Sequence, residues 1–150
     1  MKRRIVLFLT IFVFAVSTNC SGYDKDTYRA FEDYLRDNFQ SLPEEGIYVM
    51  IPTEICHTCI DNMIAMLKMP VDQRKIKVIF ITRSTALAND IISRLPETDV
   101  FIDNKYKAVK SGLVAGTHIE LFEVKSGGVK KYIYRVNENE WEIKELLQKK

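Results

Sequence analysis

The chain lacks a strong charge of either sign, and this absence argues against a nucleic-acid partner. Its 150 residues carry a formal net charge of +2. Three positive charges stand together at Lys2, Arg3 and Arg4, and the other 19 basic residues are balanced by 20 acidic ones. A nearly neutral body offers no basic patch for phosphate backbones. We therefore expect no nucleic-acid partner.

Several motifs that define other classes of protein are also missing. The chain has no glycine-rich loop to cradle a phosphate and no serine motif of a hydrolase. It has no second cysteine pair for a zinc ribbon, and Ile60 stands where c-type haem attachment needs a histidine. No repeat, low-complexity segment or interdomain linker is present. With 47% hydrophobic residues, the chain has the composition of one globular domain.

A long apolar run is absent as well. The most apolar segment, Ile5 to Val16, has about 12 residues and is short for a membrane span. It follows the three basic residues and precedes small and polar ones, which is typical of a signal peptide. We assign residues 1–22 to a signal peptide or lipoprotein signal and residues 23–150 to one domain.

The cysteine that ends this segment adds a second interpretation. Cys20 resembles the lipidated cysteine of a bacterial lipoprotein signal, although Asn19 is a poor match to the residue that such signals carry before it. A lipoprotein signal, an ordinary signal peptide and an uncleaved anchor all stay open. Each of the three places the body outside the cytoplasm, where disulfides persist.

The body alternates helical and strand patterns. One apolar face (Tyr28, Phe31, Leu35, Phe39) predicts a helix over residues 23–41. We expect further helices over 55–69, 86–95, 106–114 and 139–149, and strands over 47–51, 75–82, 99–102, 117–124 and 129–136. Residues 125–128, Lys-Ser-Gly-Gly, predict a hairpin between the last two strands.

This order of elements predicts the fold class. Strands separated by helices imply parallel pairing through right-handed crossovers, and the closing hairpin must add antiparallel strands. We therefore predict an α/β fold with a mixed sheet flanked by helices, a closing β-hairpin and a C-terminal helix. In the last helix we expect Trp141, Ile143, Leu146 and Leu147 to face mostly inward. Met63, Met66 and Met69 are read as core residues rather than as a soft-metal site.

A pair of cysteines stands at the start of the helix predicted over 55–69. Cys56 and Cys59 can cycle between dithiol and disulfide, hold a metal ion or form an inert link. A helix N-terminus lowers the pKa of a thiol through its partial positive charge and free N–H groups. His57, when protonated, would add positive charge. Glu54 would oppose this effect and is the nearest proton acceptor in sequence.

A strand that runs into Cys56-His57-Thr58-Cys59 at a helix start, followed by β-α elements, a hairpin and a helix, resembles the thioredoxin fold. The likeness is greatest to the membrane-tethered thioredoxin-like proteins of the bacterial envelope and covers roughly residues 44–149. It implies a thiol-disulfide oxidoreductase without a cofactor, acting on protein thiols and disulfides of the cell envelope. Cys56 would be the attacking thiol and Cys59 the resolving thiol. The supporting residues would be His57, Glu54, Thr117 and His118.

The chain departs from this family at the residues around the dithiol. Residues 114–118, Val-Ala-Gly-Thr-His, occupy the place of Val-x-Gly-x-Pro, so His118 stands where the family's cis-proline lies against the dithiol. Ile55 replaces an aromatic residue. The strand before the motif ends in Val49, Met50 and Ile51 and lacks the buried acid that some members carry.

These departures keep two alternatives open. Two thiolates and an imidazole, from Cys56, Cys59 and His118, would suit copper(I) or zinc. The chain could also be a non-catalytic thioredoxin-like lipoprotein that keeps the fold for protein binding, because a fold does not determine a function. The expected location, periplasm-facing and held to the membrane by a lipid or signal anchor, is the same for all three.

Overall fold

The computed structural model describes residues 22–69 and 75–148. The predicted signal segment, with its basic residues, its apolar run and Cys20, lies outside the described residues. Within the described part of the chain, no helix combines the length and the apolar character that crossing a bilayer requires.

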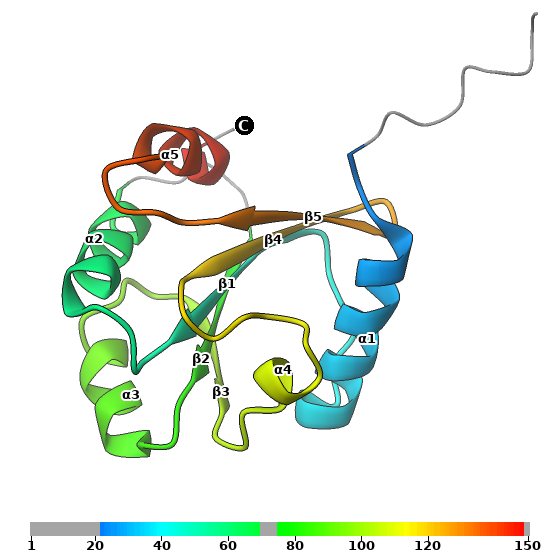
Figure 1. Ribbon diagram of the computed structural model, residues 1–150, viewed down its shortest axis with the longest axis horizontal. Coiled ribbons are helices and arrows are strands. Elements are labelled where there is room, and N and C mark those ends of the chain that lie inside the picture. Colours follow the sequence, from blue (N-terminus) through cyan, green and yellow to red (C-terminus); the bar gives the residue numbers. More distant parts are fainter. Residues whose placement is uncertain (1–21, 70–74, 149–150) are drawn as a thin grey trace, which may run out of the picture.

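A five-stranded mixed sheet forms the centre of the molecule (Figure 1). The strands lie in the order β3 (Asp99–Asp103), β2 (Ile76–Ile81), β1 (Gly46–Pro52), β4 (Glu120–Lys125) and β5 (Gly128–Ile133). β1 to β3 are parallel, while β4 pairs antiparallel with β1 and with β5. The predicted α/β class, with its mixed sheet, closing hairpin and C-terminal helix, is confirmed and is consistent with a thioredoxin-like arrangement.

Helices cover both faces of this sheet. α1 (Lys25–Phe39) and α4 (Lys107–Lys110) lie on one face, and α2 (His57–Leu67), α3 (Thr85–Ile92) and α5 (Glu140–Gln148) lie on the other (Figure 1). β1 alternates between them, as a strand buried on both sides must. Ile47, Val49 and Ile51 join the core under α2, whereas Tyr48 and Met50 join the core under α1.

Local sequence signals explain where two of these helices start. The carboxylate of Asp24 accepts hydrogen bonds from the N–H groups of Asp26 and Thr27 and caps α1. Ser84 caps α3, and its hydroxyl accepts from the Leu87 N–H at 3.2 Å. The backbone of Asp24 also pairs with Val129 through two hydrogen bonds of 2.7 and 3.1 Å, which ties the start of α1 to the β4–β5 hairpin.

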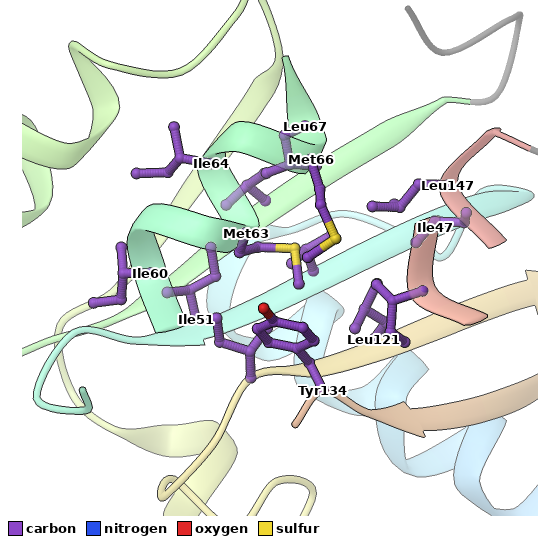
Figure 2. Close-up of a cluster of buried hydrophobic side chains, with 14 of the residues drawn as sticks. Ile47, Ile51, Ile60, Met63, Ile64, Met66, Leu67, Leu121, Tyr134 and Leu147 are labelled. Atoms are coloured by element: carbon purple, nitrogen blue, oxygen red, sulfur yellow. The ribbon is translucent and has the colours of Figure 1, made fainter. Parts of the chain in front are cut away.

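The methionines of α2 are core residues, as predicted. Met63 is fully buried and Met66 is 3% exposed, and both pack among aliphatic side chains between α2, the sheet and α5 (Figure 2). Their neighbours in this core include Ile60, Ile64 and Leu67 of the same helix. These residues therefore form the buried face of α2.

The prediction for Trp141 is wrong, since its side chain is 71% exposed. The buried residues of α5 are Ile143, Leu146 and Leu147, which share one helical face. Trp141 precedes Ile143 by two positions, about 200° around the helix, so it points away from that face.

The predicted helix over 106–114 is reduced to the four residues of α4. Tyr106 adopts a left-handed backbone conformation, with φ of 57°, and Gly112 another, with φ of 74°. After Tyr106, the N–H groups of Lys107 and Ala108 donate to the Asp103 carboxylate at 3.0 and 2.9 Å. These hydrogen bonds start the short helix. The chain leaves the helix at Gly112, which tolerates a positive φ.

Candidate dithiol site

The carboxyl ends of the parallel strands place the cysteine pair at one edge of the sheet. β1 continues into a turn, where the Thr53 N–H donates to the Ile81 carbonyl at 3.0 Å and extends the pairing with β2. Cys56 is the N-cap of α2, and its carbonyl accepts the N–H groups of Cys59 and Ile60 at 3.0 and 3.3 Å. The pair thus begins a helix, as predicted.

The two thiols have different surroundings. Cys56 is exposed, whereas Cys59 is half-buried against the core under α2, and no disulfide joins them in this structure. The Cys59 thiol lowers the pKa of Cys56 most, followed by the Cys59 backbone N–H, and the side chain and N–H of Thr58 act in the same direction. Burial raises the pKa of Cys59 to about 11, with a further contribution from Cys56.

This difference has a direct chemical meaning. The thiolate is the nucleophile in disulfide exchange, so the thiol with the lowered pKa reacts first. Cys56 is both the accessible thiol and the more acidic one. Cys59 holds its proton more strongly and lies one turn inside the helix.

Two other predicted residues flank the pair. His57 is the first residue of α2 and is exposed, next to Cys56 in the chain. Ile55, which takes the place of the family's aromatic residue, is half-buried against the core under α2. The position therefore contributes apolar packing rather than an exposed ring.

Glu54 lies beside a tyrosine at the same edge of the sheet. Burial, followed by interaction with Glu54, raises the pKa of Tyr106 to about 12. The Arg83 guanidinium lies 5.0 Å from the centroid of the Tyr106 ring, within the range of a cation–π contact. Glu54, Arg83 and Tyr106 come from the ends of β1, β2 and β3 and line this edge together. The role of Glu54 as a proton acceptor stays a prediction.

His118 precedes β4 and stands level with the end of β1. Glu120 pairs with Met50, so His118 lies two residues before the paired part of β4, near the end of β1. Its Nδ1 is 3.0 Å from the Thr117 hydroxyl, and its Nε2 is 3.3 Å from Glu120 Oε1. No peptide bond in the described residues is cis, and this includes the bond before His118.

Glu120 is a buried acid that the sequence reasoning missed. Its side chain is inaccessible to solvent, accepts the Ala115 N–H at 2.7 Å and forms an ion pair with Lys131. The sequence of β4 contained a signal for this buried acid. Glu120 alternates with Phe122 and Val124, which belong to the core under α1. A charged residue at such a position needs a partner of opposite charge.

The metal alternative finds no assembled ligand set in the described residues. Among them, no group of three histidine, cysteine, aspartate or glutamate side chains lies close enough to hold an ion. The His118 nitrogens contact Thr117 and Glu120 instead.

A second polar group that the sequence reasoning missed lies behind Cys59. One turn along α2, the Asn62 side chain donates to Glu140 Oε1 at 3.4 Å. The Tyr134 hydroxyl donates to the same oxygen at 3.3 Å. Glu140 is the first residue of α5, so this group joins α2, α5 and the segment after β5.

The interpretation of the dithiol therefore rests on its own geometry. An exposed thiol with a lowered pKa stands at a helix N-terminus, and a half-buried thiol lies beside it. No family model, no curated protein and no solved structure matches the chain.

Proposed function

We propose that this protein is a thiol-disulfide oxidoreductase that uses the Cys56–Cys59 dithiol/disulfide couple. One observation carries the proposal: the exposed Cys56 stands at the N-terminus of α2 and the half-buried Cys59 lies one turn inside it, an arrangement that lowers the pKa of Cys56 and raises that of Cys59 to about 11. An inert link or a packing cysteine needs no such difference, whereas two-step exchange depends on it.

The reaction proceeds in two exchanges. The Cys56 thiolate attacks one sulfur of a substrate disulfide, whose S–S bond breaks, and the first substrate sulfur leaves as a thiolate that takes a proton from water. Cys59 then loses its proton and attacks Cys56. The bond between Cys56 and the substrate breaks, the second substrate thiolate leaves, and the Cys56–Cys59 disulfide remains. The oxidised pair runs the same steps in reverse on a dithiol substrate.

The proposed substrates are protein thiols and disulfides of a bacterial cell envelope. The basic residues, the apolar segment Ile5 to Val16 and Cys20 support export and attachment to the membrane by a lipid or signal anchor. An extracytoplasmic compartment keeps disulfides stable and so gives such an enzyme its substrates.

The test is turnover in a disulfide-reduction assay with the full chain in detergent. We expect Cys56→Ser and Cys59→Ser each to abolish turnover, and Cys20→Ser, the matched control for the third cysteine, to retain it. Full activity of Cys56→Ser would overturn the proposal. A Cys56–Cys59 pair that does not react with a thiol-trapping reagent would point instead to a non-catalytic binding protein.

A further inference from the structure

Arg83 differs from the other arginines in the described part of the chain because it has no acidic partner there. The others each form an ion pair with a carboxylate; they are Arg29, Arg36, Arg94 and Arg135. Arg83 is exposed, and its guanidinium lies over the Tyr106 ring, 5.0 Å from the ring centroid. A guanidinium matches a carboxylate through two parallel hydrogen bonds. The charge of Arg83 is therefore available to an acidic group of another molecule.

The contact with Tyr106 holds this guanidinium in place. A cation–π contact is an attraction between the positive charge and the face of the ring, so the N–H donors of the guanidinium remain available to an acceptor. Tyr106 is half-buried and packs against the core under α1, which fixes its ring. An arginine that is already positioned loses less side-chain freedom when it binds a carboxylate.

The pairing of β1 with β2 places Arg83 at the same edge of the sheet as the dithiol. The Thr53 N–H donates to the Ile81 carbonyl at 3.0 Å. Cys56 follows Thr53 by three residues and Arg83 follows Ile81 by two, so the Cα atoms of Cys56 and Arg83 are at most about 23 Å apart. An extended substrate spans this distance in about seven residues. A protein whose cysteine reaches Cys56 can therefore also reach Arg83.

The other charges at this edge do not supply an acidic partner for the guanidinium. β1 and β2 are parallel, so α2 and α3 both begin at their carboxyl ends, and a helix N-terminus favours an anion. Asp103 is buried, and its carboxylate is occupied by the N–H groups of Lys107 and Ala108 and by the Tyr34 hydroxyl. Glu54 is exposed at the same edge and opposes an anion. Arg83 must therefore supply the attraction for an acidic substrate.

We propose that Arg83 binds a carboxylate of the substrate. It thereby selects proteins that carry an acidic residue within about seven positions of the cysteine that exchanges with Cys56. The inference rests on the proposed function and names its substrate class, and the two exchanges proceed as described above. Arg83 acts away from the reacting sulfurs, so its charge changes how readily the substrate associates rather than the exchange itself.

The test compares two peptides that each carry one cysteine, joined by a disulfide to thionitrobenzoate. The Cys56 thiolate attacks the peptide sulfur, the S–S bond breaks, and the electron pair leaves with the coloured thionitrobenzoate. The full-length, reduced chain carries Cys20→Ser, so that the colour reports the Cys56–Cys59 pair. The peptides differ only in glutamate or glutamine on both sides of the cysteine. Dividing each rate by that of 2-mercaptoethanol with the same peptide corrects for the reactivity of the peptide itself.

We expect the acidic peptide to react about fivefold faster than the neutral one at low salt, near the upper limit for an exposed ion pair. High salt should bring this ratio toward one, because it screens the charges. Arg83→Gln should bring the ratio to about one through a slower reaction of the acidic peptide. Arg83→Lys keeps the charge without the planar fork and should retain part of the preference. Arg29→Gln, the same charge change on α1, should leave the ratio unchanged.

The outcomes separate the two proposals. A ratio of one in the parent chain, or a ratio that Arg83→Gln leaves unchanged, overturns the role of Arg83 and leaves the oxidoreductase proposal standing. An equal loss of the ratio in Arg29→Gln also overturns it, because the preference would then follow the net charge. Absence of thionitrobenzoate release from both peptides overturns the oxidoreductase proposal, and the role of Arg83 with it.

Discussion

The two faces of the sheet are packed with different kinds of side chain. Under α1 the core is aromatic: the Phe31 ring stacks on Phe122 at 5.1 Å and meets Tyr48 edge-on at 4.8 Å. Under α2 the core is mainly aliphatic and contains Met63 and Met66, with Phe80 and Tyr134 as its buried rings. Aromatic pairs fix geometry, whereas methionines adapt to their neighbours. The face with the paired aromatic rings lies away from the dithiol, and the mainly aliphatic face surrounds it.

The acids on the two faces differ in their access to solvent. Under α1, Asp103 accepts hydrogen bonds from Tyr34 and from the start of α4, and Glu120 is paired with Lys131. Both are nearly inaccessible to solvent. Glu140, beside α2, is only half-buried and borders a cavity. The acids under α1 are therefore closed off from solvent, whereas the one beside α2 is open to it.

The largest expected effect comes from the aromatic face. Phe31→Ala removes a fully buried ring that contacts Tyr48 and Phe122, so we expect a loss of about 3–5 kcal/mol in the free energy of unfolding. Urea denaturation measures it. Cys56 in the folded protein should be alkylated at the unchanged rate, because the substitution lies on the other face. A loss under 1 kcal/mol, or a changed rate, would contradict the division between faces.

Met63→Ala tests the same difference between the two faces, on the face that carries the dithiol. Met63 is fully buried one turn after Cys59, and its truncation should cost about 2–5 kcal/mol. It should also lower the pKa of Cys59 from about 11, because burial is the main cause of that value and the void weakens it. A pH titration of thiolate absorbance with Cys20→Ser and Cys56→Ser both present follows Cys59. Met63→Leu, which roughly keeps the volume, should cost about 1 kcal/mol and leave the titration unchanged.

Cys59→Ala sharpens the comparison within the site. The Cys59 thiol is the largest cause of the lowered pKa of Cys56, so its removal should shift that pKa upward toward the ordinary thiol value. Less thiolate is then present at a given pH, and alkylation of Cys56 by iodoacetamide should reach half its maximal rate at a higher pH. Cys59→Ser keeps a donor and should shift the midpoint less. An unchanged midpoint in Cys59→Ala would assign the acidity to the helix N-terminus alone.

The smallest expected effect is at α5. Trp141 is 71% exposed, so Trp141→Ala should change the free energy of unfolding by no more than about 0.5 kcal/mol. Leu147, fully buried on the same helix, is the comparison, and Leu147→Ala should cost about 2–5 kcal/mol. Urea denaturation of both variants measures the difference between their losses in the free energy of unfolding. Similar losses in both would mean that Trp141 has a packing role.

The fold was predictable because its signals are local. Alternation and apolar runs mark the strands, and Cys56 at the start of α2 follows from the break between strand and helix. The polar contacts around the site were not predictable, because the residues that form them lie far apart in the sequence. Asn62 and Glu140 are 78 residues apart and meet only when α5 packs on α2. The sequence singled out His118 but not its contact with Glu120. Alternation along a strand does not show which residue a buried acid contacts.

The backbone pairing of Asp24 with Val129 also fixes where the first described residues lie relative to the dithiol. This pairing lies next to the β4–β5 hairpin, at the amino end of β1, whereas Cys56 follows the carboxyl end of β1. The seven residues of β1 separate the two ends by roughly 20 Å. If the proposed anchor lies before Gly22, it joins the described chain at the end of the sheet opposite the dithiol.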